Sequence, residues 1–400
     1  MTMSNILNAA IQGVQRSKAA FCRFITGNDT GSTGSHQSGF YIPKCASSLL
    51  FDKPGNKGEN KEKVVKIMWQ EDFITESCMK YYGKGTRNEY RITRFGRNFP
   101  FFTDDNVGDL LIIVKYTEED YAGYVLCSDE DIDEFFAYFN LAPNRTNQLI
   151  GTGDVVSGEE KITHLLNEFI LRFDDFPETR QMALGARMCY NKAYDITNSA
   201  IKDKPDDILL NWIDTEYKLF KLMEEKFYSD KISNPFPNVE SFIEIANAIL
   251  NRRKSRAGKS LEHHLADLFT CNDLYFEEQA VTEERKRPDF IFPNGVCYHN
   301  IQFPTEFLVV LGAKTTCKDR WRQVLTEADR VEDKYLFTLQ QGISKNQLKE
   351  MYDSNLTLVV PHEYIPSYPS LWQDKIKDLA GFIQMVKDKQ ENMPKHYVMK

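Results

Sequence analysis

Two neighbouring apolar segments in the second half of the chain carry residues suited to metal-dependent phosphodiester chemistry. Pro288 and Asp289 open the strand-like run PDFIF, and Lys314 ends the next apolar run, FLVVLGAK. A carboxylate can hold Mg²⁺, a hard cation that prefers oxygen ligands, and the metal lowers the pKa of a bound water. A lysine nearby can position that water and stabilise the charge that develops on the phosphate. The two segments therefore provide the first half of a nuclease site.

The second acid of such a site is missing from its usual place. The nuclease pattern has an acid two residues before the lysine, but Gly312 occupies that position. Glu327, at the edge of the apolar stripe of a helix expected from about Asp319, could supply the missing carboxylate. The triplets Glu284-Arg285-Lys286 and Glu332-Asp333-Lys334 also have an acid-x-lysine spacing. Neither places its lysine at the end of an apolar strand, so we interpret both as solvated surface charge.

Three basic segments could contact a nucleic acid. The first, KYYGKGTRNEYRITRFGR (80–97), carries six cations against one acid, with aromatic residues between them. The second, NRRKSRAGKSLE (251–262), has five cations before its first acid, and Ser255 and Gly258 predict a loop within it. The third, Lys318-Asp319-Arg320, follows the second apolar strand. Each suits phosphate or base contacts, although the first two could equally be solvated surface segments.

The elements that must position these residues differ between the two halves of the chain. In the first half, polar loops at 28–39 and 53–60 separate short β-like runs, and the acidic run 128–136 predicts a helix start. The β-like runs are FYIP (40–43), VVKIMW (64–69), LLIIVKY (110–116) and YVLC (124–127). Short strands between polar loops favour a barrel-like or sandwich-like β domain.

The second half is expected to form a different kind of domain. Helical patterns dominate from Pro177 through Leu250, and strand-like runs then alternate with helices, which indicates an α/β domain. We place the linker in LRFDDFP (171–177), which gives an N-terminal domain over 1–170 and a second domain over 178–400. A length of 400 residues agrees with two domains.

Composition narrows the class of protein. A net charge of −8 argues against a chain that is basic all over, but it leaves room for local basic clusters that bind DNA. No two of the eight cysteines have CxxC spacing, so a zinc ribbon is not expected. We expect reduced thiols in a cytoplasmic protein instead. The N-terminus lacks the features of a signal peptide, and no apolar run is long enough for a membrane span.

Several long segments resemble the EcoRII-type restriction endonucleases. The family's catalytic domain is matched, in order and spacing, by NRRKSRAGKSLE, RKRPDFIFP, AKTTCKDRWRQVLTEAD, LFTLQQGIS and LVVP. The segments NDTGSTGSHQSGFYIP and TRNEYRITRFGR resemble the family's N-terminal effector domain. The similarity is dense over about 236–361 and patchy in 28–43 and 86–97. It is weak over 44–80, 100–170 and 178–235.

For the second domain, the resemblance implies a PD-(D/E)xK endonuclease with a central mixed sheet, in which the second acid has moved to the following helix. It selects Asp289, Lys314 and Glu327 as catalytic residues, with Asp289 and Glu327 as ligands of Mg²⁺, and it adds Glu262 as a further metal or water contact. It also implies that Lys318, Asp319 and Arg320 read base edges. Arg253 and Arg256 are the phosphate contacts that we expect from the basic segment 251–262.

For the first domain, the resemblance implies a DNA-binding β pseudobarrel similar to that of plant B-three transcription factors. It would bind a second copy of the target and relieve autoinhibition. The motif residues that would contact this effector DNA are His36, Tyr41, Arg87, Asn88, Glu89 and Arg91. Tyr90 stands where the family's motif has a lysine, so one contact to effector DNA is expected to differ.

The resulting hypothesis is a type IIE-like restriction enzyme that cleaves double-stranded DNA at a CCWGG-like site, where W is A or T. A homodimer would match the twofold symmetry of such a site, and a cognate DNA methyltransferase would act on the same site. A non-catalytic DNA-binding regulator and a monomeric nicking enzyme are the alternatives, and the Asp289–Lys314–Glu327 set disfavours the regulator. Tyr298 could suggest a covalent, recombinase-like nucleophile, but we favour a structural role for it.

Overall fold

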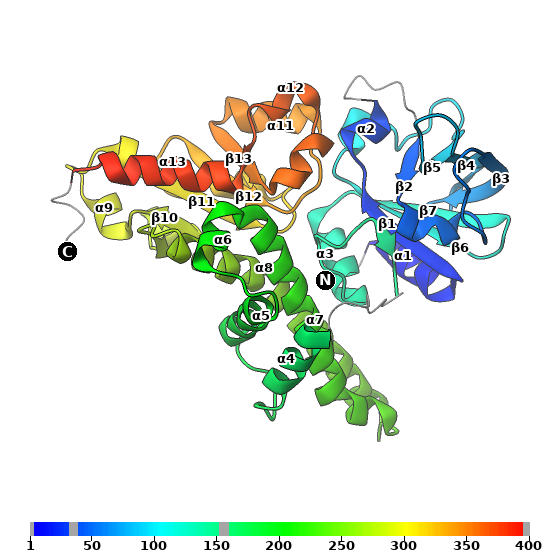
Figure 1. Cartoon of the computed structure of the whole chain (residues 1–400), viewed down its shortest axis with the longest axis horizontal. Coiled ribbons are helices and arrows are strands. Elements are labelled where there is room, and N and C mark those ends of the chain that lie inside the picture. Colours follow the sequence, from blue (N-terminus) through cyan, green and yellow to red (C-terminus); the bar gives the residue numbers. More distant parts are fainter. Residues whose placement is uncertain (1–3, 32–38, 152–159, 395–400) are drawn as a thin grey trace. The chain divides into compact units, whose positions relative to one another are not determined.

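The computed structural model describes residues 4–31, 39–151 and 160–394, and these fall into two compact units (Figure 1). The N-terminal unit comprises Met1–Gly153 together with Gln340–Glu350 and Pro366–Asp374. The C-terminal unit comprises Asp154–Leu339, Met351–Ile365 and Lys375–Lys400. Every helix in the described part of the chain is too short or too polar to cross a bilayer.

The N-terminal unit is built on one curled sheet of eight strands, the half-barrel expected from the sequence. The strand order is β2-β5-β4-β3-β7-β6-β1-β8, and all neighbours are antiparallel except β3 and β7. The strands are β1 (Ala19–Phe24), β2 (Phe40–Ile42), β3 (Asn60–Trp69), β4 (Phe73–Tyr82), β5 (Glu89–Thr93), β6 (Leu110–Lys115), β7 (Asp120–Leu126) and β8 (Gln148–Leu149). The helical segments are α1 (Asn5–Arg16), α2 (Gly27–Thr30), η1 (Lys44–Leu49), η2 (Asp104–Asn106) and α3 (Asp129–Phe139).

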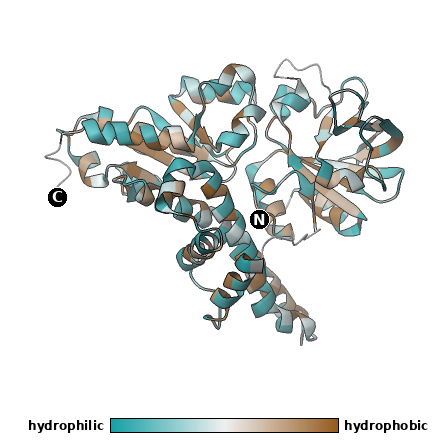
Figure 2. Cartoon of the chain, viewed as in Figure 1, coloured by the Kyte–Doolittle hydropathy of each residue, from teal (hydrophilic) through white to brown (hydrophobic). Residues whose placement is uncertain are grey.

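The apolar run LLIIVK forms β6 because both faces of this strand are buried. Leu111 and Ile113 pack inside the curl of the sheet, in a cluster that contains Trp69. Ile112 and Val114 point to the other face, where residues of α1 and α3 cover them. Hydrophobic residues accordingly follow the strands of both sheets (Figure 2).

The C-terminal unit is the α/β domain with a mixed sheet that the sequence predicts. The strand order is β14-β13-β12-β11-β10-β9. Strands β11 to β14 are parallel to each other, β10 is antiparallel to β11, and β9 is antiparallel to β10. The strands are β9 (Glu277–Glu278), β10 (Phe290–Phe292), β11 (Val309–Lys314), β12 (Lys334–Thr338), β13 (Leu356–Val360) and β14 (Lys377–Asp378).

The helices of the second half precede, connect and follow these strands. Those before the sheet are α4 (Glu160–Ile170), α5 (Thr179–Ala193), α6 (Asn198–Asp203), α7 (Pro205–Ser233) and α8 (Val239–Cys271). The later helical segments are η3 (Glu283–Arg285), α9 (Gly295–His299), η4 (Thr305–Phe307), α10 (Trp321–Leu325), α11 (Lys345–Asp353), η5 (His362–Ser367), α12 (Ser370–Gln373) and α13 (Leu379–Asn392).

The helical layer begins earlier than the linker expected at 171–177. Helix α4 buries Ile162 and Leu166 against residues of α5 and α7 in one apolar cluster. The two units divide between Gly153 and Asp154, ahead of this helix. The segment 171–177 is therefore a connection inside the helical layer.

Helix α8 corrects a second expectation, because it runs unbroken through the basic segment in which a loop was predicted. The serine at 260 is buried and donates to Glu216 Oε2 at 2.7 Å. Leu261 and Leu265 pack in the core beside it. Ser255 and Gly258, from which the loop was predicted, lie inside this helix, because its tertiary packing outweighs their weak helix propensity.

Candidate active site

Asp289 and Lys314 meet where β10 begins and β11 ends. The two strands are antiparallel, with Phe290 opposite Leu311, and this register brings the start of one strand to the end of the other. Asp289 Oδ2 accepts from the backbone N–H of Ala313 at 2.7 Å and from Lys314 Nζ at 3.0 Å. The sheet therefore fixes the separation of the acid and the lysine.

Steric contact with α10 explains why the acid two residues before Lys314 is absent. A Cβ atom on Gly312 would lie 2.6 Å from Val324 Cγ2, a distance that real Cβ atoms essentially never show. Val324 is fully buried in α10 and fills the space that an acid at 312 would need. The second carboxylate must therefore come from another element.

Glu327 supplies a carboxylate from the turn after α10, and not from the helix on which it was expected. The helix ends at Leu325, and Ala328 has a φ of 57°, which breaks the helical path. Glu327 Oε2 is buried and has no hydrogen-bond partner among the described residues. Burial first, and then the charge of Asp289, raise the pKa of Glu327 to about 7. This carboxyl group therefore keeps an acceptor oxygen that no described donor satisfies.

Two side chains that the sequence did not mark as functional hold the turn that contains Glu327. Tyr298 donates from its OH to the Glu283 carboxylate, at 2.7 and 2.6 Å from its two oxygens. Glu283 Oε2 then accepts from the backbone N–H of Asp329 at 3.3 Å, and Tyr298 OH accepts from that of Arg330 at 3.2 Å. A buried tyrosine that bonds a carboxylate and a backbone amide fits the structural role that we favoured over a nucleophilic one.

Glu262 adds a further carboxylate from α8. Its Oε2 accepts from Lys259 Nζ at 2.9 Å, one turn earlier on the same helix, and from Gln279 Nε2 at 3.3 Å. Burial raises the pKa of Glu262, the charge of Asp289 adds to the rise, and Lys259 and Lys314 oppose it. Gln279 also donates to Asp289 Oδ1 at 3.0 Å, although nothing in its residue type had singled it out.

The oxygen-rich environment of these residues fits Mg²⁺. Asp289, Glu262 and Glu327 offer carboxylate oxygens, which are the ligands that this hard cation prefers. Glu327 Oε2 has no hydrogen-bond partner among the described residues, and the charge of Asp289 adds to the rise in pKa that burial causes in Glu262 and Glu327. In the described part of the chain, no three acids, histidines or cysteines already converge in a complete ligand set. Mg²⁺ keeps several waters in proteins, so one or two carboxylates are sufficient to hold it.

The predicted base-reading residues form a turn between β11 and α10. Lys318 is largely buried, Asp319 is exposed, and Arg320 donates from Nη2 to Thr316 Oγ1 at 2.7 Å. The N-cap of α10 is Arg320, so Asp319 does not cap this helix. The turn begins four residues after Lys314, on the segment that continues from β11.

The two arginines predicted to contact phosphates have partners inside the helical layer. Arg253 bonds both oxygens of Glu224, at 2.7 and 2.9 Å. Arg256 is buried, with its guanidinium 3.7 Å from the centroid of the Tyr217 ring. Both side chains therefore contact α7, which the basic segment did not lead us to expect. To contact a phosphate, Arg253 would have to leave Glu224 and Arg256 would have to leave Tyr217.

The predicted effector contacts lie on and beside β2 and β5, which are neighbours in the N-terminal sheet. Tyr41 on β2 is exposed and lies opposite Arg91 on β5. Arg91 pairs with Glu89, with 3.4 Å between Nε and Oε1. Arg87 stacks on Tyr82, and Asn88 Oδ1 accepts from Tyr81 OH at 3.0 Å. His36 lies outside the described residues.

Tyr90, which departs from the family's motif, lies in the core of the N-terminal unit. Its side chain is buried, its ring packs against Tyr81 and Phe51, and its OH accepts from the backbone N–H of Gly55 at 2.7 Å. Alternation along β5 puts Glu89 and Arg91 on the opposite face from Tyr90. A tyrosine here stabilises the core of the half-barrel.

Comparisons with known proteins match both parts of the chain. A family model described as EcoRII C terminal matches residues 220–383, and one described as Restriction endonuclease EcoRII, N-terminal, matches residues 14–145. The type II restriction enzyme EcoRII from Escherichia coli is 35% identical over 405 residues, covering 96% of this chain and 97% of that enzyme. The type II restriction enzyme SsoII from Shigella sonnei is 23% identical over 235 residues, covering 51% of this chain and 72% of that enzyme.

Solved structures give weaker similarities to part of the chain. Metal-depleted Ecl18kI in complex with uncleaved, modified DNA is 20% identical with a TM-score of 0.46, and covers 58% of this chain and 85% of that one. The PspGI complex with substrate DNA is 15% identical with a TM-score of 0.45, and covers 54% of this chain and 94% of that one.

Proposed function

The chain belongs to the EcoRII family of type II restriction endonucleases, and from that membership we propose that it hydrolyses both strands of a CCWGG-like site with Mg²⁺. The observation that supports the catalytic assignment is the convergence of Asp289, Lys314 and Glu327 at the end of β11. A non-catalytic DNA-binding regulator would have no use for a buried, unpartnered carboxylate beside an acid–lysine pair.

In this proposal the chain's residues position the reacting groups. Asp289, fixed by the Ala313 amide, and Glu327, fixed by its turn, would hold Mg²⁺, with Glu262 as a further metal or water contact. When bound, the metal polarises the scissile phosphate and lowers the pKa of a water. Lys314 would orient the attacking water and stabilise the negative charge that develops on the phosphate.

Base reading would come from the turn that follows Lys314. Arg320 and Lys318 can donate to guanine O6 and N7, and Asp319 can accept from cytosine N4. Because this turn continues directly from the strand that carries the catalytic lysine, recognition and cleavage would be coupled through a short piece of backbone. Two copies of the chain would bring one such site to each strand of the target.

The N-terminal unit would bind a second copy of the target and thereby activate cleavage. Tyr41, Arg87, Asn88, Glu89 and Arg91 lie together on neighbouring strands and the loop before β5, which supports this role. Binding of DNA there would favour the active state only through a difference in affinity between the two states. A cognate methyltransferase would protect the same sequence in the host.

Cleavage of plasmids by the purified full-length chain tests this proposal. We expect Mg²⁺-dependent linearisation of a plasmid that carries two CCWGG sites, slower cutting of a plasmid with one, and cleaved ends that map to those sites. Addition of a short CCWGG duplex should accelerate the one-site reaction, and Arg87→Ala should weaken that response. Nicking without linearisation would favour the monomeric alternative, and equal rates on both plasmids would overturn two-site activation.

A further inference from the structure

Gln279 joins two acids of the candidate active site. It follows β9, and its backbone N–H donates to the carbonyl oxygen of Asp289 at 3.2 Å. Its side-chain nitrogen lies 3.0 Å from Asp289 Oδ1 and 3.3 Å from Glu262 Oε2. One amide group therefore connects the acid at the start of β10 to the acid on α8.

The chemistry of an amide suits this position. A carboxylate only accepts hydrogen bonds, whereas an amide nitrogen has two hydrogens to donate, so Gln279 can serve both acids at once. Two carboxylates that lie within reach of one nitrogen repel each other, and the polar hydrogens between them offset part of this repulsion. A glutamate at 279 would add a third negative charge, and a methionine would leave both acids without this donor.

The backbone of Gln279 is held in an uncommon conformation. Its φ is 54°, in the left-handed region where residues other than glycine are rare. Such conformations cost free energy and persist where surrounding contacts determine them. Here the determining contacts are the backbone bond to Asp289 and the two side-chain bonds to the acids.

We propose that Gln279 is a positioning residue for DNA cleavage: it holds Glu262 beside Asp289 so that both acids can serve one bound Mg²⁺. This inference rests on the proposed assignment of Asp289 and Glu262 to the active site. Without Gln279, the remaining described hydrogen-bond partner of the Glu262 carboxylate is Lys259, a half-exposed side chain on its own helix. Glu262 would then keep its charge but lose its connection to Asp289.

Two variants of the full-length enzyme test this role. Gln279→Met keeps the length of the side chain without the donor, and Gln279→Gly removes the side chain at a φ that glycine adopts freely. We expect both to weaken Ca²⁺ binding to the enzyme–duplex complex, measured by calorimetry, by about 10- to 100-fold, as for other partners of metal-binding residues. The Mg²⁺ concentration that gives half-maximal cleavage should rise in parallel, and the rate at saturating Mg²⁺ should return to near that of the wild type.

Asn355→Gly is the matched control, because Asn355 also has a positive φ and its side chain bonds Glu332 outside the site. It should leave the metal dependence unchanged. In a Glu262→Gln background, Gln279→Met should add little further loss, since residues that act through one another are not additive.

The outcomes separate this inference from the proposed function. Efficient cleavage by Asp289→Asn would overturn the active-site assignment itself. An inactive Asp289→Asn variant together with wild-type metal binding in both Gln279 variants would overturn the role of Gln279 alone. A lower rate at saturating Mg²⁺ with unchanged Ca²⁺ affinity would also contradict positioning through the metal-binding acids.

Discussion

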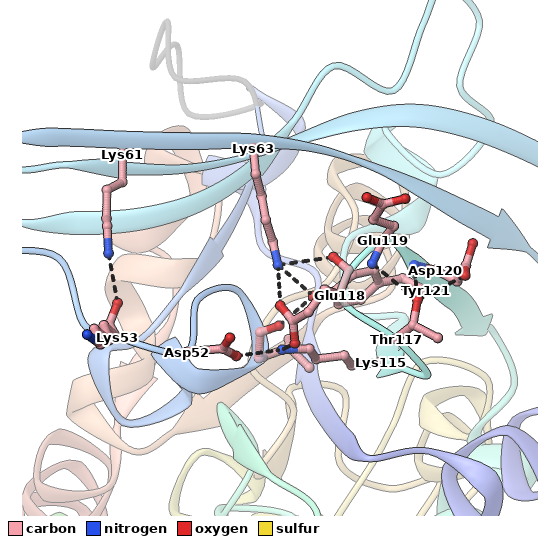
Figure 3. A network of polar contacts seen from close by, with 11 residues as sticks. Asp52, Lys53, Lys61, Lys63, Lys115, Thr117, Glu118, Glu119, Asp120 and Tyr121 are labelled. Carbon is pink, nitrogen blue, oxygen red and sulfur yellow. Dashed lines mark hydrogen bonds and ion pairs between the residues drawn. The ribbon is translucent and has the colours of Figure 1, made fainter.

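Lysines and acids lie close together in two parts of this chain, and the pKa of one glutamate shifts in opposite directions in the two. In the N-terminal sheet, the Glu118 carboxylate lies 3.0 Å from Lys63 Nζ and 2.5 Å from Lys115 Nζ, and Lys115 also lies 3.4 Å from Asp52 (Figure 3). The hydrogen bonds from Lys115 and Lys63 lower the pKa of Glu118 to about 2. At the end of β11, burial and Asp289 instead raise the pKa of Glu327 to about 7.

The difference lies in charge balance and not in residue type. Glu118 and Asp52 both have lysine partners, so their charges are balanced within the sheet without any ligand. Glu327 has a buried oxygen with no partner among the described residues, and Lys314 is already bonded to Asp289. A perturbed, incompletely paired group is a better indicator of function than a cluster of charges is. Four sets of substitutions would break or sharpen this comparison.

The largest effect is expected from Asp289→Asn and Lys314→Ala. Each removes a charge from the Asp289–Lys314 ion pair of the candidate active site, so the rate of plasmid cleavage should fall by about 10²–10³-fold or more. Binding to a CCWGG duplex without metal should persist in both variants, as measured by gel shift. Lys115→Ala is the matched control from the balanced cluster: it should lower stability but leave the cleavage rate of the folded enzyme close to wild type.

Gly312→Glu should lower stability strongly. It restores the usual acid position of the nuclease pattern, but its Cβ would lie 2.6 Å from Val324 Cγ2 and would add a charge to an already acidic site. We expect a loss of about 3 kcal/mol in the free energy of unfolding, measured with urea, from overpacking and the buried charge. Val324→Ala in the same chain should recover part of this loss. A stable, active Gly312→Glu enzyme would contradict the steric explanation for the displaced acid.

Glu327→Gln and Glu118→Gln should change the stability of the metal-free protein in opposite directions. The pKa of Glu327 rises from 4.5 to about 7, so its contribution to stability falls as pH rises through that window, and glutamine removes this penalty. For Glu327→Gln we expect a gain of about 1–2 kcal/mol in the free energy of unfolding at pH 8, together with loss of cleavage.

The pKa of Glu118 falls from 4.5 to about 2, so its contribution to stability is present above pH 4.5 and is lost toward pH 2. Glu118→Gln should therefore destabilise the protein at pH 8, by less than about 1 kcal/mol because the group is exposed. Urea denaturation at pH 8 and pH 5 measures both changes. Equal signs at pH 8 would show that the two clusters do not differ in charge balance.

The sequence predicts the sheets better than it predicts the details of the site. Alternating and continuous apolar runs locate β6, β10, β11, β12 and β13, because burial acts on the chain locally. The unbroken α8 and the turn after α10 depend on tertiary contacts: Ser260 bonds Glu216, and the backbone after α10 bonds Glu283 and Tyr298. Asp289 and Lys314 are visible as strand-end residues, whereas Gln279, Glu283 and Tyr298 act through partners far along the chain. No local pattern marks such residues.

Among the substitutions at the candidate active site, Tyr298→Phe has the smallest expected effect on cleavage, and it tests how Glu327 is held. The change removes the bond to Glu283 and leaves the Arg330 N–H without its acceptor, so the free energy of unfolding should fall by about 1–2 kcal/mol. Tyr335→Phe is the matched control, because Tyr335 packs on Phe382 in the same unit without contacting the Glu327 turn. A looser turn should raise the Mg²⁺ concentration needed for half-maximal cleavage and leave cutting at saturating Mg²⁺ largely intact. Complete loss of cleavage at every Mg²⁺ concentration, with a covalent protein–DNA adduct formed only by the wild type, would instead identify Tyr298 as a nucleophile.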